Sequence, residues 1–229
     1  MQDTGRTAGA EEGYGKGWNP ADHYKTADIA EAYDAERFTS LAGRTFDRLE
    51  KGYIRKAFVG LAVGARVADI PCGTGRLAET LLEHGFDVSG FDISAAMLEV
   101  AGRRLKRFGT RFSATVGDAR RITPPTEPFD AVLCARVLMH FPLPEQIEFL
   151  KGAARLTGGP VIITHSLDTP YQRFRRWIKR MLRHANPVSY PLANADIRRL
   201  LDDAGLREVR RFRPMPLLTE EIILVAEKR

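Results

Sequence analysis

The sequence contains little cysteine and no long apolar run. Only two of its 229 residues are cysteines, Cys72 and Cys134, and both lie in apolar contexts that predict burial. Two such residues supply neither a disulfide framework nor a thiolate metal site, so a reducing, cytoplasmic setting is expected, with no bound metal. No stretch approaches the roughly 20 apolar residues of a membrane-spanning helix, and the first residues lack the apolar core of a signal peptide. These shortages argue against a disulfide-rich secreted protein and an integral membrane protein.

Acidic residues are missing from one segment, Tyr171 to His184, although the chain as a whole has 29 of them against 35 lysines and arginines. The segment's cations equal the formal excess of +6: Arg173, Arg175, Arg176, Lys179, Arg180 and Arg183. At helical spacing they lie largely opposite an apolar face that includes Phe174 and Trp177. The pattern predicts a basic amphipathic helix, which can serve as a substrate lid, contact an anionic membrane or be an ordinary surface helix packed on the sheet.

A glycine-rich turn near the centre of the chain organises the rest. The apolar run from Ala65 to Ile70 contains one acid, Asp69, and is followed by Pro71, Gly73 and Gly75. Apolar residues then resume at helical spacing. The pattern predicts a buried parallel strand, a tight turn and a helix, with the glycines leaving room for a ligand to approach the backbone.

Strands and helices alternate after this turn. Six further strands are predicted, at 87–91, 112–116, 129–134, 161–164, 208–212 and 221–226. The last two are joined by too short a link for a helical crossover, so they should be antiparallel. The fold class is therefore α/β, a doubly wound, Rossmann-like sheet of seven strands with its last strand antiparallel.

Four segments differ in composition. Residues 1–19 lack periodicity and are expected to be a disordered tail. Residues 20–63 have apolar residues at helical spacing and should form an N-terminal helical cap. Residues 64–229 form the ligand-binding domain, in which residues 167–190 are an inserted lid containing the basic helix.

Acids recur where strands end. Asp69 precedes the glycine turn, Asp92 closes the second strand and Asp118 follows Gly117 after the third. With the Gly73-Thr-Gly75 turn and the closing antiparallel pair, these motifs make the chain resemble the class I S-adenosylmethionine-dependent methyltransferases from about Tyr24 to its end. The chain departs from that family at Pro71, where glycine is usual.

The resemblance implies S-adenosyl-L-methionine as cofactor. In that family the acid at the position of Asp69 faces the cofactor's amino group, the acid at Asp92 holds the ribose hydroxyls, and the acid at Asp118 binds the adenine amino group. The implied cofactor residues are Arg37, Asp69, Gly73, Gly75, Asp92, Ile93, Met97, Asp118, Ala119 and Ala135. A simpler interpretation of Asp92 and Ser94 as helix-start residues stays open.

Two histidines follow strands at the expected ligand edge. His140 matches a Leu-x-His pattern of the family through Leu138, and it is the candidate general base, because imidazole titrates near neutrality. His165, Tyr24 and Tyr171 are candidate substrate contacts. For either histidine, a hydrogen bond to a neighbouring backbone group is the alternative role.

The predicted function is O-methylation of a small-molecule or lipid-like acceptor. N- or C-methylation, a nicotinamide-dependent oxidoreductase and a binding module without catalysis are the alternatives. A pyrophosphate would be a poor neighbour for Asp69, which disfavours the dinucleotide. Nucleic acid is not expected as a substrate, because no Asn-Pro-Pro-aromatic motif is present and few aromatic residues lie among the basic ones. Peripheral contact with the inner face of an anionic membrane through 171–184 is a further expectation.

Overall fold

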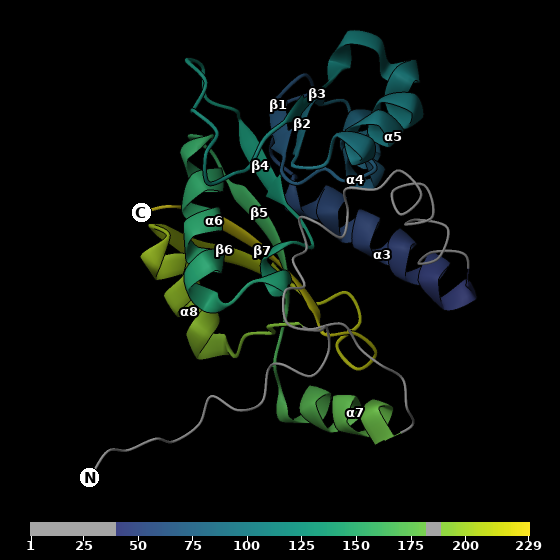
Figure 1. The fold of residues 1–229 in the computed structure, drawn as a ribbon, viewed down its shortest axis with the longest axis vertical. Helices are drawn as coiled ribbons and strands as arrows, with labels where there is room; N and C mark the ends of the chain where they lie inside the picture. The colour runs from purple at the N-terminus through teal and green to yellow at the C-terminus, as the bar shows by residue number, and fades with distance from the viewer. Residues whose placement is uncertain (1–39, 182–188) are drawn as a thin grey trace.

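A computed structural model describes residues 40–181 and 189–229, and Figure 1 shows a central twisted sheet with helices on both faces. The strands are β1 (Arg66–Asp69), β2 (Asp87–Asp92), β3 (Phe112–Val116), β4 (Ala131–Cys134), β5 (Val161–Ser166), β6 (Leu206–Phe212) and β7 (Glu221–Lys228). The helices are α3 (Leu41–Ala57), α4 (Arg76–Glu83), α5 (Ala95–Leu105), α6 (Leu143–Arg155), α7 (Pro170–Met181) and α8 (Asn194–Asp203), with short 3-10 turns η1 (Lys106–Arg111) and η2 (Leu138–His140).

The strand order is β3-β2-β1-β4-β5-β7-β6. The pairs among β1 to β5 are parallel, whereas β7 runs antiparallel to both of its neighbours, β5 and β6. This confirms the predicted seven-stranded α/β sheet and the antiparallel closing pair. Because β7 is reversed, it begins at the edge where the parallel strands end, so Glu221 lies opposite Ser166. That edge is the one at which open α/β sheets bind ligands.

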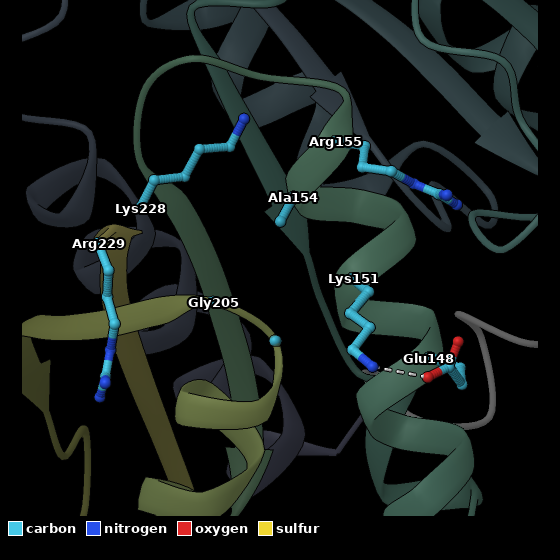
Figure 2. Close-up of a pocket in the computed structure, with 8 residues that line it drawn as sticks. Glu148, Lys151, Ala154, Arg155, Gly205, Lys228 and Arg229 are labelled. Atoms are coloured by element: carbon cyan, nitrogen blue, oxygen red, sulfur yellow. Dashed lines mark hydrogen bonds and ion pairs between the residues drawn. The ribbon is translucent and has the colours of Figure 1, made fainter.

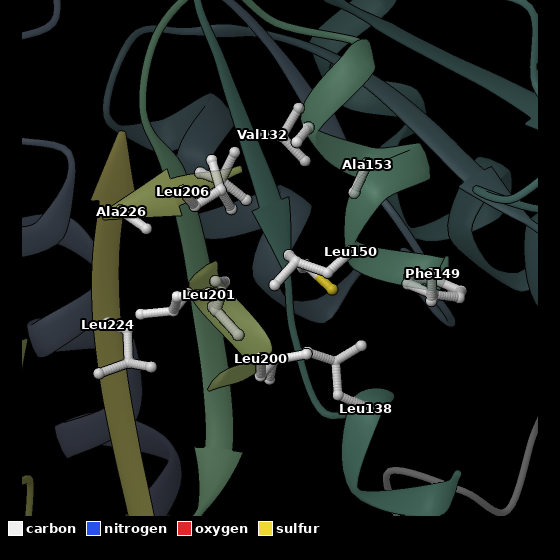
Figure 3. Packing of buried hydrophobic residues seen from close by; sticks show 14 of the residues in the cluster. Val132, Leu138, Phe149, Leu150, Ala153, Leu200, Leu201, Leu206, Leu224 and Ala226 are labelled. Atoms are coloured by element: carbon white, nitrogen blue, oxygen red, sulfur yellow. The ribbon is translucent and has the colours of Figure 1, made fainter. Parts of the chain in front are cut away.

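Two apolar cores fill the space on either side of the sheet. One contains Leu150 of α6 and Leu200 of α8, packed on Val132 and Leu224 (Figure 3). The other contains Ile54 of α3 with residues of α4 and the opposite faces of the same strands. Alternate residues of each central strand thus enter different cores, as a sheet covered on both faces requires.

Three predicted segments fall partly or wholly outside the described residues. The tail at 1–19 and the part of the cap at 20–63 that precedes residue 40 are among them; residues 40–63, which include α3, are the described part of that cap. The basic helix is described as α7, and residues 182–188 are not. The domain bounds therefore stay a prediction. In the described part of the chain, no helix is long and apolar enough to cross a membrane.

The prediction that the apolar face of the basic helix packs on the sheet, one of three left open, is wrong. The exposed fractions of Phe174 and Trp177 are both 56%. Their rings stack on each other with centroids 5.9 Å apart. Polar contacts attach α7 to the rest of the domain instead. In one of them, the buried Gln172 side chain donates to the carbonyl of Thr219 at 2.8 Å.

Candidate cofactor and acceptor site

The glycine turn after β1 is left-handed at two positions. Gly73 has φ 53° and Gly75 has φ 77°, a region that side chains with a Cβ rarely adopt. A Cβ on Gly75 would lie 2.8 Å from the Leu105 side chain, so α5 is what excludes one there. No described atom lies within 4 Å of a Cβ built on Gly73. The open side of the turn is therefore at Gly73, at the ligand edge of the sheet.

Asp69 lies at the end of β1 with 1% of its surface exposed. Among the described residues, neither of its carboxyl oxygens has a hydrogen-bond partner of good geometry, although the nearby Ala78 backbone N–H and the Arg76 guanidinium act to lower its pKa. Burial, and secondarily the nearby Asp92, raises the pKa of Asp69 well above its usual value. A buried carboxyl group without a donor is costly, and an incoming cation with N–H groups would relieve that cost. Asp69 therefore fits the ammonium group of a ligand.

Asp92 has partners within the chain. Its two oxygens accept hydrogen bonds from the backbone N–H of Gly73 and from that of Ser94, each at 2.9 Å. Burial raises the pKa of Asp92, although these bonds oppose the change. The Ser94 hydroxyl in turn caps α5 by accepting from the Met97 N–H at 3.2 Å. The helix-start role is thus real, and each oxygen keeps a further lone pair with which to bind a hydroxyl group.

Asp118 is occupied by Arg120, two residues later. The guanidinium donates to both carboxyl oxygens at 2.7–3.1 Å, and the Arg120 N–H donates as well. Burial would raise the pKa of Asp118, but the hydrogen bonds from Arg120 lower it below its usual value. A ligand amino group must therefore share this carboxylate with Arg120, which the sequence interpretation did not include.

Four more of the implied cofactor residues lie around the same edge, Ile93, Met97, Ala119 and Ala135. Ile93 follows Asp92 and exposes 41% of its surface, whereas Met97, Ala119 and Ala135 are buried. Arg37 and Tyr24 lie outside the described residues. Tyr171 is half exposed on α7, and its hydroxyl donates to the carbonyl of Leu217 at 3.0 Å.

The two histidines have different surroundings. His140 is half buried in the turn η2, which follows β4. Its backbone N–H donates to the Val137 carbonyl at 3.0 Å. His165 is fully buried, and its Nε2 lies 2.8 Å from Oε1 of Gln146. Burial lowers the pKa of His165 to about 4. The structure therefore does not favour a substrate contact for His165.

His165 is linked by hydrogen bonds to the chain beside His140. Its partner Gln146 donates through Nε2 to the carbonyl of Phe141 at 2.7 Å, next to His140. The histidine thus orients an amide that holds the chain beside the candidate base.

A buried group of charged residues beside the turn was not predicted. Arg76 donates to Glu50 at 2.6 Å and to Asp47 at 2.5 Å, joining α4 to α3. Arg136, at φ 58°, follows β4 and lies 3.5 Å from the other oxygen of Glu50. The i, i+3 spacing of Asp47 and Glu50 on one helix is visible in the sequence, but no pattern there indicates that Arg76 is their partner. No pattern in the sequence predicts the left-handed backbone conformation of Arg136 either.

Among the described residues, a pocket of about 390 Å³ lies at the edge of the sheet opposite the ligand edge (Figure 2). Lys151 and Arg155 of α6 line it, together with Lys228 and Arg229 at the end of β7. Figure 2 shows Lys151 and Arg155 on the C-terminal half of α6, where positive charge offsets the exposed carbonyl groups, and Arg229 pairs with Asp202 near the end of α8. It is therefore not the candidate active site.

Comparison with known proteins gives a family for the central part of the chain. Residues 67–158 match a family model described as a methyltransferase domain. A ubiquinone biosynthesis O-methyltransferase of Azoarcus sp. strain BH72 is 31% identical, over 59% of this chain and 63% of that protein. One of Pectobacterium atrosepticum is 28% identical, over 70% and 69% respectively. The match to a relative of the same name from Coxiella burnetii covers only 39% of that protein, so the chain spans less than two thirds of several curated relatives.

Solved structures agree on the fold. A magnesium protoporphyrin IX methyltransferase from Synechocystis PCC 6803, solved with bound S-adenosylhomocysteine, has a TM-score of 0.74. It is 20% identical, and the match covers 91% of this chain and 98% of that one. A methyltransferase from Streptomyces caelestis has a TM-score of 0.66 at 18% identity, over 87% and 96%. Identities this low carry the architecture alone.

The buried state of Asp69 makes a prediction about stability. Because its pKa is raised on folding, the protonated form is favoured in the native state, and native stability is lost as pH rises above the unfolded value of 3.8. Asp69→Asn should therefore raise the free energy of unfolding of the ligand-free protein, and its advantage should be larger at pH about 8 than at about 4.5. Urea denaturation at the two pH values measures this. A variant that is less stable than the wild type at the higher pH would contradict the assignment.

Proposed function

We propose that this chain, a member of the class I S-adenosylmethionine-dependent methyltransferases, transfers the methyl group of S-adenosylmethionine to an oxygen atom of a small or lipid-like acceptor. The observation that carries the proposal is the buried Asp69, beside an open glycine turn, whose carboxyl oxygens have no well-placed hydrogen-bond donor among the described residues. The naming of the curated relatives as O-methyltransferases supports oxygen rather than nitrogen or carbon as the acceptor atom.

The charges at the edge of the sheet fit this cofactor better than a dinucleotide. S-adenosylmethionine has ammonium and sulfonium charges, which suit the neighbouring acids Asp69 and Asp92. A nicotinamide dinucleotide would place a pyrophosphate at the same turn, where both carboxyl groups would disfavour it.

The residues in place would hold the cofactor along β1, β2 and β3. Asp69 would accept from the ammonium group, and Asp92 from the ribose hydroxyls. Asp118 and Ile93 would flank the adenine, with Met97, Ala119 and Ala135 as the apolar lining. When bound, the cofactor supplies a methyl group already activated on sulfur, so the chain's own tasks are alignment and proton removal.

His140 is the proposed general base. Its imidazole would take the proton of the acceptor hydroxyl as that oxygen receives the methyl group. The contacts of Gln146 and His165 would keep the base beside the end of β4.

Replacement of the base tests this role. His140→Ala should lower turnover by about 10²-fold or more and leave cofactor affinity within about twofold, because the base acts only on the acceptor. Turnover is measured with methyl-labelled S-adenosylmethionine, and affinity by calorimetry. The exposed His84 provides the control His84→Ala, which should change neither quantity. Full turnover in the His140 variant would assign the histidine a structural role.

Helix α7 supports a finer part of the proposal, peripheral contact with an anionic membrane that carries the acceptor. Arg173 and Arg176 form ion pairs with Asp168, and Arg176 also pairs with Glu220 at 2.8 Å. These pairs bind the helix to the body through its polar side. They also neutralise two of the positive charges that the sequence analysis expected to contact an anionic membrane.

The apolar side of α7 then faces outward. Phe174 and Trp177 stack there, and Leu217 and Leu218 on the adjacent loop are about two-thirds exposed. A surface of this kind, rimmed by cations, is typical of a helix that lies in a membrane interface. We therefore expect the aromatic pair to contribute more to membrane binding than Arg173 and Arg176.

Sedimentation with lipid vesicles tests this contact. The full chain should bind vesicles containing phosphatidylglycerol more tightly than pure phosphatidylcholine vesicles, with salt weakening the binding. Phe174→Ala with Trp177→Ala should reduce partitioning at least about tenfold, since each side chain contributes roughly 1.5–3 kcal/mol when buried. Leu41→Ala, at an exposed leucine of α3, is the control. Equal, negligible binding to both vesicle types would leave α7 as a lid.

A further inference from the structure

The register of the sheet divides its ligand edge into two parts. The proposed cofactor residues lie at the ends of β1, β2 and β3, whereas β4, β5 and the start of β7 bring no cofactor acid to that edge. Val67, Leu133, Ile162 and Ile223 share the core under α3. Since side chains alternate along a strand, Asp69, Thr164 and Glu221 project from that same face, further toward the ligand edge. These buried polar side chains form a diagonal row toward β7, because Asp69 is level with Leu133, Thr164 with Ile223 and Glu221 with Ser166.

The carboxyl group of Glu221, the last member of this row, is buried and poorly hydrogen-bonded. It is 8% exposed, and neither of its carboxyl oxygens has a hydrogen-bond partner among the described residues. Arg136 lies 3.8 Å from one of them, beyond hydrogen-bond reach. Burial and the neighbouring Glu50 raise the pKa of Glu221 well above its usual value.

Glu50 faces the same position from α3. It is fully buried, and its Oε2 accepts from Arg76 at 2.6 Å. Its Oε1 has no hydrogen-bond partner in the described part of the chain, although Arg136 is 3.5 Å away. Burial alone would raise the pKa of Glu50, but Arg136 and Arg76 lower it. The two carboxyl groups lie close enough to share a proton, which would occupy one oxygen of each. The second oxygen of Glu221, at this end of the row, then has no donor in the described part of the chain.

The charge balance around them selects the kind of donor. Asp47 and Glu50 face three bases, Lys51, Arg76 and Arg136, and Lys51 pairs with Asp47 at 3.0 Å. Because the raised pKa of Glu221 favours its neutral form, the bases already outnumber the ionised acids, and the group does not require another cation. A neutral hydroxyl donor satisfies the oxygens without adding charge.

We propose that Glu221, with Glu50 behind it, accepts a hydrogen bond from a hydroxyl group of the acceptor other than the one that is methylated. This makes Glu221 a specificity-determining residue for acceptors with at least two hydroxyl groups. The inference rests on the proposed function, because it takes β4, β5 and β7 as the acceptor side of the site. Arg136, held by the hydrogen bond from its N–H to Thr164 at 2.8 Å, would keep the two carboxyl groups in place.

Catechol and 1,2-dimethoxybenzene are suitable probes, since they differ only in their hydroxyl groups. Both are titrated into the full chain by NMR, with and without S-adenosylhomocysteine. The wild type should prefer catechol by roughly tenfold or more, and Glu221→Gln should remove most of that preference. Glu227→Gln makes the same change near the other end of β7 and should leave the preference intact. Catechol should also shift the methyl resonance of Ile223 and not that of Ile197.

Two results would overturn the inference. One is an absence of preference in the wild type, including no binding of either probe. The other is unchanged catechol binding in a folded Glu221→Gln chain. Should that variant fail to fold, the wild-type preference and the Ile223 shift decide alone. Binding of S-adenosylhomocysteine and transfer of labelled methyl groups test the proposed function separately. Failure of the proposed function is therefore distinguishable from failure of the inference about Glu221.

Discussion

The ion pair between Arg76 and Glu50 connects the parts of the site. Arg76 is the first residue of α4, directly after the glycine turn, and Glu50 lies on α3, so their 2.6 Å contact holds the N-terminal helix against the turn. Both side chains are buried, and removal of either partner would leave an uncompensated charge in the core. The same guanidinium lowers the pKa of Glu50 and partly offsets the rise at Asp69. The position of α3, the shape of the turn and the charge state of the site therefore depend on one another.

The buried acids at the ligand edge divide into two groups. Asp92 and Asp118 are hydrogen-bonded within the chain, to the Gly73 and Ser94 backbone and to Arg120, so they shape the turn and the loop after β3. Asp69 and Glu221 lack such partners among the described residues. A protein selected for stability alone would gain from replacing them. Their presence is explained if one meets the cofactor ammonium and the other an acceptor hydroxyl.

Most of the fold followed from the sequence, because hydrophobic periodicity and glycine positions report directly on buried strands and turns. The third strand ends at Val116 as predicted, and the first two end within one residue of the predicted positions, at Asp69 and Asp92. The sequence did not predict the ion-pair partners of the buried charged residues, since Arg76 meets Glu50 only through the packing of α3 on α4. His165 illustrates the same limit: its place after strand residues predicted a ligand contact, but the packing of α6 gives it Gln146 instead. For α7, helical spacing gave the two faces correctly, and Asp168 and Glu220 decided which of them turns inward.

The central claim is that Asp69 meets the ammonium group of an S-adenosylmethionine-type cofactor. Calorimetric titration of the full chain with S-adenosylhomocysteine, for the wild type and Asp69→Asn, tests it most directly. The wild type should bind one molecule per chain. The variant should bind about 10–100-fold more weakly, the equivalent of about 1.5–3 kcal/mol for a hydrogen bond to a charged group. Equal affinities, or no binding by the wild type, would contradict the account.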